Sequence, residues 1–325
     1  MDSFYGYPSI ARAESVLQII EEDLLTTATE CELDASIKLH GSNAAIVKHS
    51  LNGPLTFQSR SRLITPTDDN AGFATTMTKN MDIVLNIFEQ IEKIDENIIY
   101  PVIVFGEWCG KGIQKNVALN TLNDKIFVIF DIAFSSQKLW QSMDKYASVK
   151  SAPLIRNVRE VPSFKFTLKR NERQACIDAV KKKVNEIDQV CPFVYYLYGL
   201  KGFGEGLVVR PASSTNPDHW WKCKGENHVI KIPTDKLKAP MSDDPEIVAL
   251  NQFASKYVTW ERVLSAKEAL HLRENTNDLM RAFPKINKWV FDDIEREEPE
   301  IKDTNPKLRK QAFTRRLKEI ILCCE

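Results

Sequence analysis

The residues with the clearest chemical potential lie in one short stretch, Ile37-Lys38-Leu39-His40-Gly41-Ser42-Asn43. Its lysine stands three residues before a glycine, between two segments with strand character. A neutral lysine amine is a nucleophile that can carry a group covalently. An ordinary lysine has a pKa of ~10.4, so it needs burial and nearby positive charge to lose its proton. Lysine and glycine are common, so the spacing alone is a weak signal, and the rest of the chain must supply what such a lysine needs.

Other charged residues stand at the ends of apolar, β-rich segments. They are Glu107, Asp131, Glu205, Lys222 and Lys224, next to YPVIVFG, KIFVIF, GLVVR and WW. Buried charges are costly unless they are paired or coordinate a ligand. Any one of them could be a strand-end residue that faces water. Together with Lys38, however, they predict a shared, charged pocket.

The elements that must position these side chains follow from hydrophobic periodicity. Helices are predicted at 13–25, 80–95 and 170–190, and strands at 33–38, 44–47, 57–63, 100–107, 125–133, 205–210 and 220–224. A turn is expected at 41–43 and a glycine loop at 108–114. In a strand over 57–63, Arg60 and Arg62 would share one face. The short connections favour antiparallel pairing, so this part of the chain is predicted to be α+β.

The amino-acid composition changes near APMSDDP at 239–245, where prolines and acidic residues indicate a linker. Helical patterns follow, at 246–258, 260–272, 276–294 and 306–322. We therefore predict two domains, 1–240 with mixed structure and 245–325 with helices alone. The stretch 307–318 has six basic residues and no acid. It is either a solvated helix face or a basic patch for a nucleic-acid backbone.

Composition limits the function classes. The 325 residues include 44 basic and 44 acidic side chains, and this balance argues against an indiscriminate polyanion binder but not against a local basic groove. No apolar run approaches the ~20 residues that span a membrane. The N-terminus lacks the features of a secretory signal. Seven scattered cysteines without a C-x-x-C pair favour reduced thiols, so we expect a cytoplasmic protein, including the case of a virus-encoded protein acting inside a host cell. We also expect a monomer.

The order of the motifs carries a resemblance. K-x-x-G at 38–41, F-G-E at 105–107, F-V-I-F-D-I at 127–132, E-G-L-V-V-R at 205–210 and W-K-C-K at 221–224 resemble the covalent nucleotidyltransferase superfamily. That superfamily contains ATP-dependent DNA ligases, RNA ligases and mRNA capping enzymes. K-x-H-G-[ST]-N is similar to the RNA ligases of the phage RNA ligase 2 type, whereas DNA ligases usually have K-x-D-G. The resemblance covers about residues 4–235 and implies an antiparallel-sheet, ATP-grasp-like nucleotidyltransferase domain.

The resemblance also implies roles for the motif residues. Lys38 would attack the α-phosphate of ATP, release pyrophosphate and hold AMP as a phosphoramidate. Lys222 and Lys224 would lie at that phosphate and offset its charge, and Glu205 would bind a Mg²⁺ or Mn²⁺ ion that bridges to phosphate. Glu107 is similar to the ribose-binding carboxylate.

The resemblance implies further contacts to the nucleotide and to the nick. Phe130 would stack on adenine, and Ile37 and Leu39 flank the nucleophile at the nucleotide. His40 would act late in the reaction, and Asn43 near the nick phosphate. Either Arg60 or Arg62 resembles the arginine that touches the nucleotide or the nick. Arg210 departs from the pattern, since related ligases often have lysine there.

These inferences predict an ATP-dependent RNA ligase that forms lysyl-AMP, transfers AMP to an RNA 5′-phosphate and joins that end to a 3′-hydroxyl. Nicks in duplex RNA or RNA–DNA hybrid are the expected substrate, with single strands and tRNA breaks left open. A DNA ligase, a capping-type enzyme and a non-catalytic nucleic-acid-binding relative are the alternatives. The first two usually carry a C-terminal β barrel, and the helical pattern after residue 245 argues against them.

Overall fold

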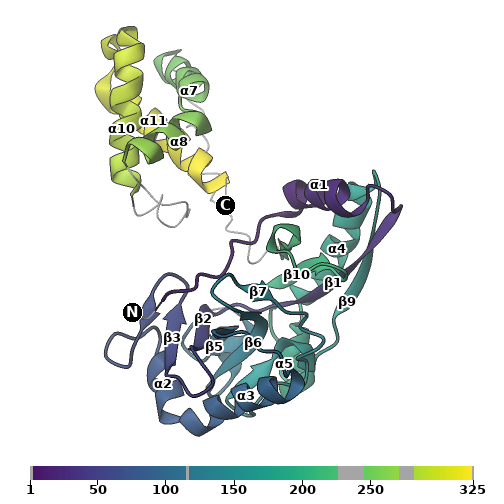
Figure 1. Ribbon diagram of the computed structural model, residues 1–325. Coiled ribbons are helices and arrows are strands. Elements are labelled where there is room, and N and C mark those ends of the chain that lie inside the picture. Colours follow the sequence, from purple (N-terminus) through teal and green to yellow (C-terminus); the bar gives the residue numbers. More distant parts are fainter. Residues whose placement is uncertain (1–2, 115–116, 226–244, 271–281, 324–325) are drawn as a thin grey trace. The chain divides into compact units, whose positions relative to one another are not determined.

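The computed structural model describes residues 3–114, 117–225, 245–270 and 282–323 (Figure 1). The chain divides into two compact units, Met1–Val229 and Ile230–Glu325. The predicted linker falls almost wholly outside the described residues, so the predicted domain boundary stays a prediction. Among the described residues, no helix combines the length and the apolar character that crossing a membrane requires.

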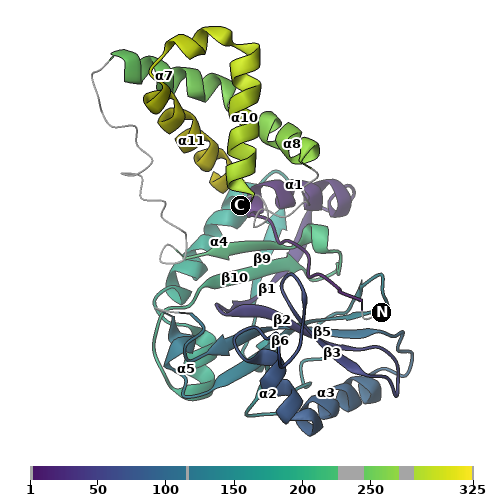
Figure 2. The same cartoon turned by 90° about the vertical axis from the view of Figure 1, so that its left-hand side faces the viewer.

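The first unit contains a four-stranded antiparallel sheet. Its order is β11 (Trp221–Lys224), β10 (Gly206–Pro211), β1 (Glu30–Lys38) and β9 (Phe164–Lys169). Because side chains alternate along a strand, Leu33, Ala35 and Ile37 of β1 point to one face and are buried there. Helices α1 (Ala13–Leu24) and α4 (Arg173–Ile187) contribute to this core and lie beside the sheet in both views (Figures 1 and 2). The opposite face carries polar side chains.

A second, larger sheet packs its own core. Its order is β4 (Leu63–Ile64), β3 (Leu55–Ser59), β2 (Ser42–Lys48), β5 (Val102–Gly110), β6 (Lys125–Phe134) and β7 (Leu139–Trp140), with β8 (Ile155–Asn157) parallel to β6. Helices α2 (Phe73–Lys79) and α3 (Met81–Ile94) cover one face. On the other face Ala45, Ile103 and Phe105 pack beneath Tyr7 and Trp140. The remaining elements of this unit are α5 (Pro192–Tyr198) and the 3₁₀ turns η1 (Ala118–Thr121), η2 (Val158–Glu160) and η3 (Pro217–His219).

The second unit is helical where it is described. It consists of α7 (Pro245–Tyr257), α8 (Trp260–Ala269), α10 (Phe283–Glu297), η4 (Pro299–Asp303) and α11 (Pro306–Cys323). Leu250, Val290, Phe313 and Leu317 are buried in its core. The predicted α+β class with a helical C-terminal part is therefore confirmed. Residues 271–281, which include the start of the predicted helix at 276–294, lie outside the described residues.

The basic stretch on α11 is only partly available to a ligand. Arg309 is buried and pairs with Glu295 at 3.0 Å. Arg316 pairs with Glu319 at 3.3 Å, and Arg315 hydrogen-bonds Asn251. Lysines 307, 310 and 318 remain exposed. A role for this surface in binding a nucleic-acid backbone stays a prediction.

Three local predictions were wrong. The strand expected over 57–63 is broken, because β3 ends at Ser59 and the chain turns before β4, with the Ser59 amide donating to the Arg62 carbonyl at 2.9 Å. The glycine loop expected from Trp108 begins later, because Trp108, Cys109 and Gly110 continue β5 and pair with β6. The turn expected at 41–43 is shorter, because Ser42 and Asn43 already belong to β2 and pair with β5, and β1 and β2 belong to different sheets.

Candidate active site

Lys38 is the last residue of β1, at the point where the chain leaves one sheet and enters the other. Gly41 makes this crossing possible. Its amide donates to Oε1 of Glu107 at 2.7 Å, and a Cβ atom at this position would lie 2.4 Å from the carbonyl oxygen of Trp108. Only glycine lets the loop approach β5 this closely. The K-x-x-G spacing therefore fixes the loop after Lys38 against β5.

The polar face of the four-stranded sheet gathers three lysines. Gly206 of β10 pairs with Lys38 on one side and Lys224 on the other, and Val208 pairs with Lys222. Cross-strand partners project on the same face, so the three lysines share it. Gly206 has φ +146°, and a Cβ atom there would lie 2.1 Å from the carbonyl oxygen of Cys223. A glycine is needed where the two lysine-bearing strands meet β10.

Glu205, just before β10, is the counter-charge for this cationic face. Its side chain is almost fully buried. Oε2 lies 2.7 Å from Nζ of Lys38 and 3.2 Å from Nδ1 of His40, and Oε1 lies 3.0 Å from Nζ of Lys224. Burial alone raises the pKa of Glu205, but Lys38, His40 and Lys224 together hold it well below its ordinary value. The carboxylate therefore stays ionised and connects Lys38 with His40 and Lys224.

Lys222 is the third lysine on the same face, and its own pKa is lowered. Its side chain is partly buried, and this burial, with the charges of Lys224 and Lys38, lowers the pKa of Lys222 to about 8. An ammonium in this position gains by binding phosphate, because the anion compensates both for burial and for the neighbouring positive charges. The cluster is thus suited to a polyphosphate.

Glu107 lies across the site, on β5. Burial, partly offset by the charge of Lys38, raises the pKa of Glu107 to about 7. Its cross-strand partner on β2 is Asn43, so the two side chains project on the same face. The structure thus brings Glu107 and Asn43 together, beside the loop that follows Lys38.

Phe130 and Asp131 occupy an irregular step of β6. The register with β5 shifts here, with Phe105 opposite Asp131 and Gly106 opposite Ile129, which leaves Phe130 without a partner. Such a bulge redirects side chains and is common beside functional sites. The Phe130 ring is half-buried and meets the ring of Tyr7 edge-on at 5.0 Å.

Asp131 joins the two sheets. It accepts hydrogen bonds from both terminal nitrogens of Arg210 on β10, at 2.6 and 3.2 Å, and one from the hydroxyl of Tyr7. The Arg210 guanidinium in turn lies 4.2 Å from the ring centre of the buried Trp220. A forked, stacked contact of this kind uses geometry that only arginine provides. It accounts for the arginine at this departure from the family pattern.

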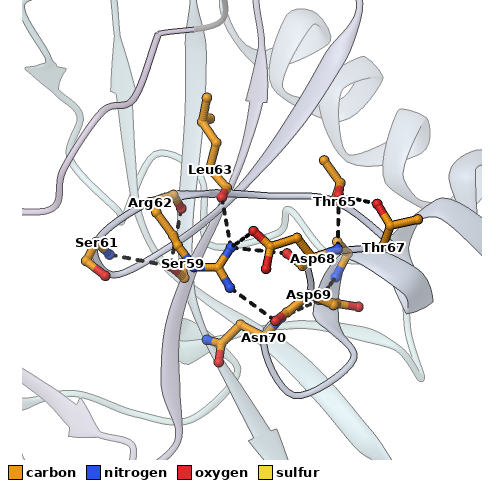
Figure 3. Close-up of polar contacts among 10 residues, drawn as sticks. Ser59, Ser61, Arg62, Leu63, Thr65, Thr67, Asp68, Asp69 and Asn70 are labelled. Carbon is orange, nitrogen blue, oxygen red and sulfur yellow. Dashed lines mark hydrogen bonds and ion pairs between the residues drawn. The ribbon is translucent and has the colours of Figure 1, made fainter.

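Arg60 and Arg62 have different hydrogen-bond partners in the structure. Arg60 is half-buried, donates to the carbonyl of Pro8, and is close enough to Glu107 for their charges to interact. Arg62 instead donates to Asp68, at 2.6 Å to its carboxylate, and to the carbonyl of Asp69 (Figure 3). Arg62 therefore organises its own loop, whereas Arg60 faces the candidate site.

Ile37 and Leu39 have buried side chains in the core behind the sheet. A contact between either residue and a nucleotide in front of the sheet would therefore use backbone atoms. This arrangement follows from the alternation of β1, which sends Lys38 forward and Ile37 backward.

Three residues of the site carried no recognisable motif in the sequence. Tyr7 comes from the N-terminal segment and reaches Asp131, 124 positions away. Ser36 and Val208 are register partners at the centre of the lysine-bearing face. The period-2 alternation of β1 and β10 could have identified Ser36 and Val208, whereas no sequence signal pointed to Tyr7.

The donor set limits how a metal could be held. Within the described ranges, no group of three or more His, Cys, Asp or Glu side chains is placed to hold one. Mg²⁺ commonly binds through one or two carboxylates together with substrate phosphates and water. Glu205 fits that mode by its charge and oxygen donors, although both of its oxygens contact cationic side chains in this structure.

Comparison with known proteins identifies the family. A family model described as RNA ligase matches residues 33–232, which is more than half of the 325-residue chain. The chain therefore belongs to the RNA ligase family. The matched range contains all the motif residues from Lys38 to Lys224.

Solved structures that match part of this chain include RNA ligase from Naegleria gruberi. One structure, described as containing pyrophosphate, aligns with a TM-score of 0.48 and 16% identity over 72% of this chain and 60% of that chain. Another, a variant described with ATP and Mn, aligns with a TM-score of 0.46 and 15% identity over 70% of this chain and 58% of that chain. The match thus spans less than two thirds of those proteins.

Proposed function

We propose that this protein is an ATP-dependent RNA ligase that uses Lys38 as its AMP-accepting nucleophile. The observation that carries the proposal is the cluster around Glu205, in which one buried carboxylate contacts Lys38, His40 and Lys224. Lys222 shares the same face of the sheet. A nucleophile surrounded by groups that bind and neutralise phosphate is what nucleotidyl transfer requires. Membership of the RNA ligase family agrees with this reaction.

In the first step, the neutral amine of Lys38 attacks the α-phosphorus of ATP. A nitrogen–phosphorus bond forms, the bond to the pyrophosphate oxygen breaks, and the amine loses a proton to solvent. Nζ of Lys38 donates a hydrogen bond to Glu205 at 2.7 Å, so this contact must loosen before the attack. Lys222 and Lys224 can assist by balancing negative charge on the phosphates as they enter.

A divalent cation, Mg²⁺ or Mn²⁺, would be held by Glu205 together with the phosphates. Such an ion supplies charge neutralisation at the phosphates when it is bound. This chain's own residues do the remaining work in the first step. Glu107 would accept hydrogen bonds from the ribose hydroxyls, and the half-buried ring of Phe130 would stack on adenine. Val208 offers an apolar surface between Lys222 and Ser36.

In the second step, an oxygen of the RNA 5′-phosphate attacks the phosphorus of lysyl-AMP, and the Lys38 amine leaves with a proton. In the third step, the RNA 3′-hydroxyl loses its proton to solvent and attacks the activated 5′-phosphate, so that an ester bond forms, the anhydride bond breaks and AMP leaves. We expect His40, Asn43 and Arg60 to serve these later steps. His40 contacts Glu205, Asn43 is the cross-strand partner of Glu107, and Arg60 is close enough to Glu107 for their charges to interact. Ends held together at a nick in duplex RNA or RNA–DNA hybrid are the first substrates to test, and the phage RNA ligase 2 type is the subgroup that K-x-H-G-S-N favours.

The test is incubation with ATP labelled at the α-phosphate, in the presence of Mg²⁺ or Mn²⁺. We expect a covalent, acid-labile adduct on the wild-type protein and none on Lys38→Ala. Lys169→Ala, which removes an exposed lysine of β9, is the matched control and should keep the adduct. An adduct on Lys38→Ala would show that the mechanism is wrong. Tight RNA binding without any adduct on the wild type would favour a non-catalytic relative instead.

Substrate choice needs a sealing assay with nicked duplex RNA, an RNA–DNA hybrid, nicked DNA and single strands. Sealing of RNA-containing substrates above nicked DNA is the expected result. Preferential sealing of nicked DNA would place the activity with the DNA ligases and overturn the RNA assignment.

A further inference from the structure

The first unit exposes an unusual number of large apolar side chains in one short segment. Within the described residues, eleven large hydrophobic side chains are exposed, and four of them lie between positions 195 and 203. These four are Tyr195, Tyr196, Leu200 and Phe203, which we call the 195–203 surface. Tyr196 is 67% exposed. Scattered exposed hydrophobic residues need no explanation, but a local concentration of them indicates a binding surface.

The 195–203 surface is held rigidly. Tyr195 and Tyr196 lie on α5, and their ring centres are 5.8 Å apart. The following segment turns back to the start of this helix, where the amide of Cys191 donates to the Gly202 carbonyl at 2.8 Å. The carbonyl of Phe203 accepts from the amide of Ala118 in η1 at 2.9 Å. The rings are therefore presented on a fixed backbone.

The same segment leads directly into the candidate active site. Phe203 stands two residues before Glu205, so their Cα atoms are at most about 7 Å apart. Gln114 also donates to the carbonyl of Gly41 at 3.2 Å, in the segment that follows Lys38. A chain bound on the 195–203 surface could therefore continue toward Lys38.

The charge of the segment selects the class of partner. No acidic residue occurs from Gln189 to Gly204, and Lys201 stands among the exposed rings. The adjoining site adds Lys38, Lys222 and Lys224. Exposed aromatic rings beside cationic groups suit a polyanion with flat apolar bases, because every base has a face that can stack. A purely apolar protein partner would make no use of the adjoining lysines.

We propose that the 195–203 surface is a stacking platform for unpaired RNA nucleotides next to the break that is to be sealed. This inference rests on the proposed function, because it specifies which RNA approaches Lys38. Bases inside a perfect duplex are stacked on their neighbours and have no free face. The platform therefore favours breaks flanked by unpaired nucleotides over fully paired nicks.

The experiment measures binding of a fluorescently labelled single-stranded RNA oligonucleotide, and of the same strand in a blunt duplex, by anisotropy with the full chain. We expect Tyr196→Ala and Phe203→Ala each to weaken single-strand binding about tenfold, the scale of one lost stacking contact. Binding of the blunt duplex should change less than twofold. Leu51→Ala, at a 58% exposed leucine in another loop, is the matched control and should leave both affinities unchanged.

A second pair of variants separates stacking from apolar contact. Tyr196→Trp keeps an aromatic ring and should bind single-stranded RNA at least as well as the wild type. Tyr196→Leu keeps apolar area without a ring and should bind like Tyr196→Ala. Equal binding by the tryptophan and leucine variants, or unchanged binding by both alanine variants, would overturn the platform and leave the surface to a protein partner.

Lysyl-AMP formation, which needs no RNA, is measured on the same variants. All of them should form the adduct at the wild-type rate, which also shows that they are folded. Loss of the adduct together with RNA binding in the alanine variants would assign the residues a structural role and overturn the platform. A wild type that forms no adduct yet binds RNA through these rings would contradict the proposed ligase while supporting the surface.

Discussion

Nζ of Lys38 and Oε2 of Glu205 lie 2.7 Å apart, although 167 residues separate them in the chain. Glu205 also contacts Lys224 and His40, so one buried carboxylate balances the cationic face. Its removal would take away the ionic contact that these groups share. It would also remove the oxygens proposed to hold a metal.

We predict that Glu205→Gln slows lysyl-AMP formation by at least about 100-fold, which is the scale found when one electrostatic partner of a transition state is lost. The rate of label incorporation from α-labelled ATP measures the effect. Asp68→Asn is the control, because Asp68 forms an exposed pair with Arg62 away from the site. A wild-type rate in Glu205→Gln would refute both roles proposed for this carboxylate.

Glu107 should make stability depend on pH. Its pKa is raised from 4.5 to about 7 in the folded protein, so the folded state holds an extra proton between these values. Stability is therefore lost as the pH rises through this window, and the full cost is present above pH 7. The side chain at this position cannot ionise in Glu107→Gln, so this variant does not lose stability from it as the pH rises.

The free energy of unfolding of Glu107→Gln, relative to the wild type, should rise by about 2 kcal/mol between pH 5 and pH 8, since each pKa unit corresponds to ~1.4 kcal/mol. Urea titrations of both proteins at each pH give this difference, and other titrating groups cancel in it. A difference that stays constant across the window would show that Glu107 titrates normally.

Lys222 should make nucleotide affinity depend on pH at the alkaline end. Its pKa is lowered to about 8, so the free protein loses this charge earlier than an ordinary lysine would. Bound phosphate favours the ammonium, and affinity should fall above pH 8, by at most about tenfold per pH unit. Lys222→Arg keeps its charge and should flatten the profile.

Calorimetry at each pH measures this affinity with an ATP analogue that has a methylene group between the α- and β-phosphates. The analogue cannot release pyrophosphate, so binding is measured without the reaction. Lys182→Arg, at an exposed lysine on α4, should leave the wild-type profile intact. If Lys222→Arg shows the same alkaline fall as the wild type, another group causes it.

The sequence predicted elements whose signal is local. Apolar runs such as 125–133 form strands, and the described segments after residue 245 form helices, because periodicity and burial agree there. The charged ends of the apolar strands also pointed to a common site, and the structure does gather Lys38, Glu205 and Lys224. This part was predictable because a charge at the edge of a buried strand needs a partner.

The rest depended on contacts between distant segments. Nothing local shows that the chain changes sheets at Gly41, since a strand–turn–strand pattern fits a hairpin equally well. Arg60 and Arg62 matched a strand pattern, but Arg62 forms a network with Asp68 and Asp69 that bends the chain (Figure 3). Tyr7 reaches the site from a segment without regular structure, which periodicity cannot identify.

The contact between Arg210 and Asp131 gives the last prediction. Both side chains are largely buried, and Asp131 also accepts a hydrogen bond from Tyr7. Arg210→Leu would leave a buried carboxylate without a cation, so the free energy of unfolding should fall by about 3 kcal/mol or more. Arg210→Lys keeps the charge but loses the two forked hydrogen bonds and the stacking on Trp220. Its free energy of unfolding should lie between those of Arg210→Leu and the wild type.

The double variant Arg210→Leu/Asp131→Asn tests the cause. It removes both charges, so it should be more stable than Arg210→Leu alone, because the cost comes from the unpaired carboxylate more than from the lost attraction. Urea unfolding of the wild type, the single variants and the double variant completes the cycle. If the double variant is less stable than Arg210→Leu, then the Asp131 carboxylate stabilises the fold even without Arg210, as through the hydrogen bond it accepts from Tyr7, and the unpaired charge is not the cause of the loss.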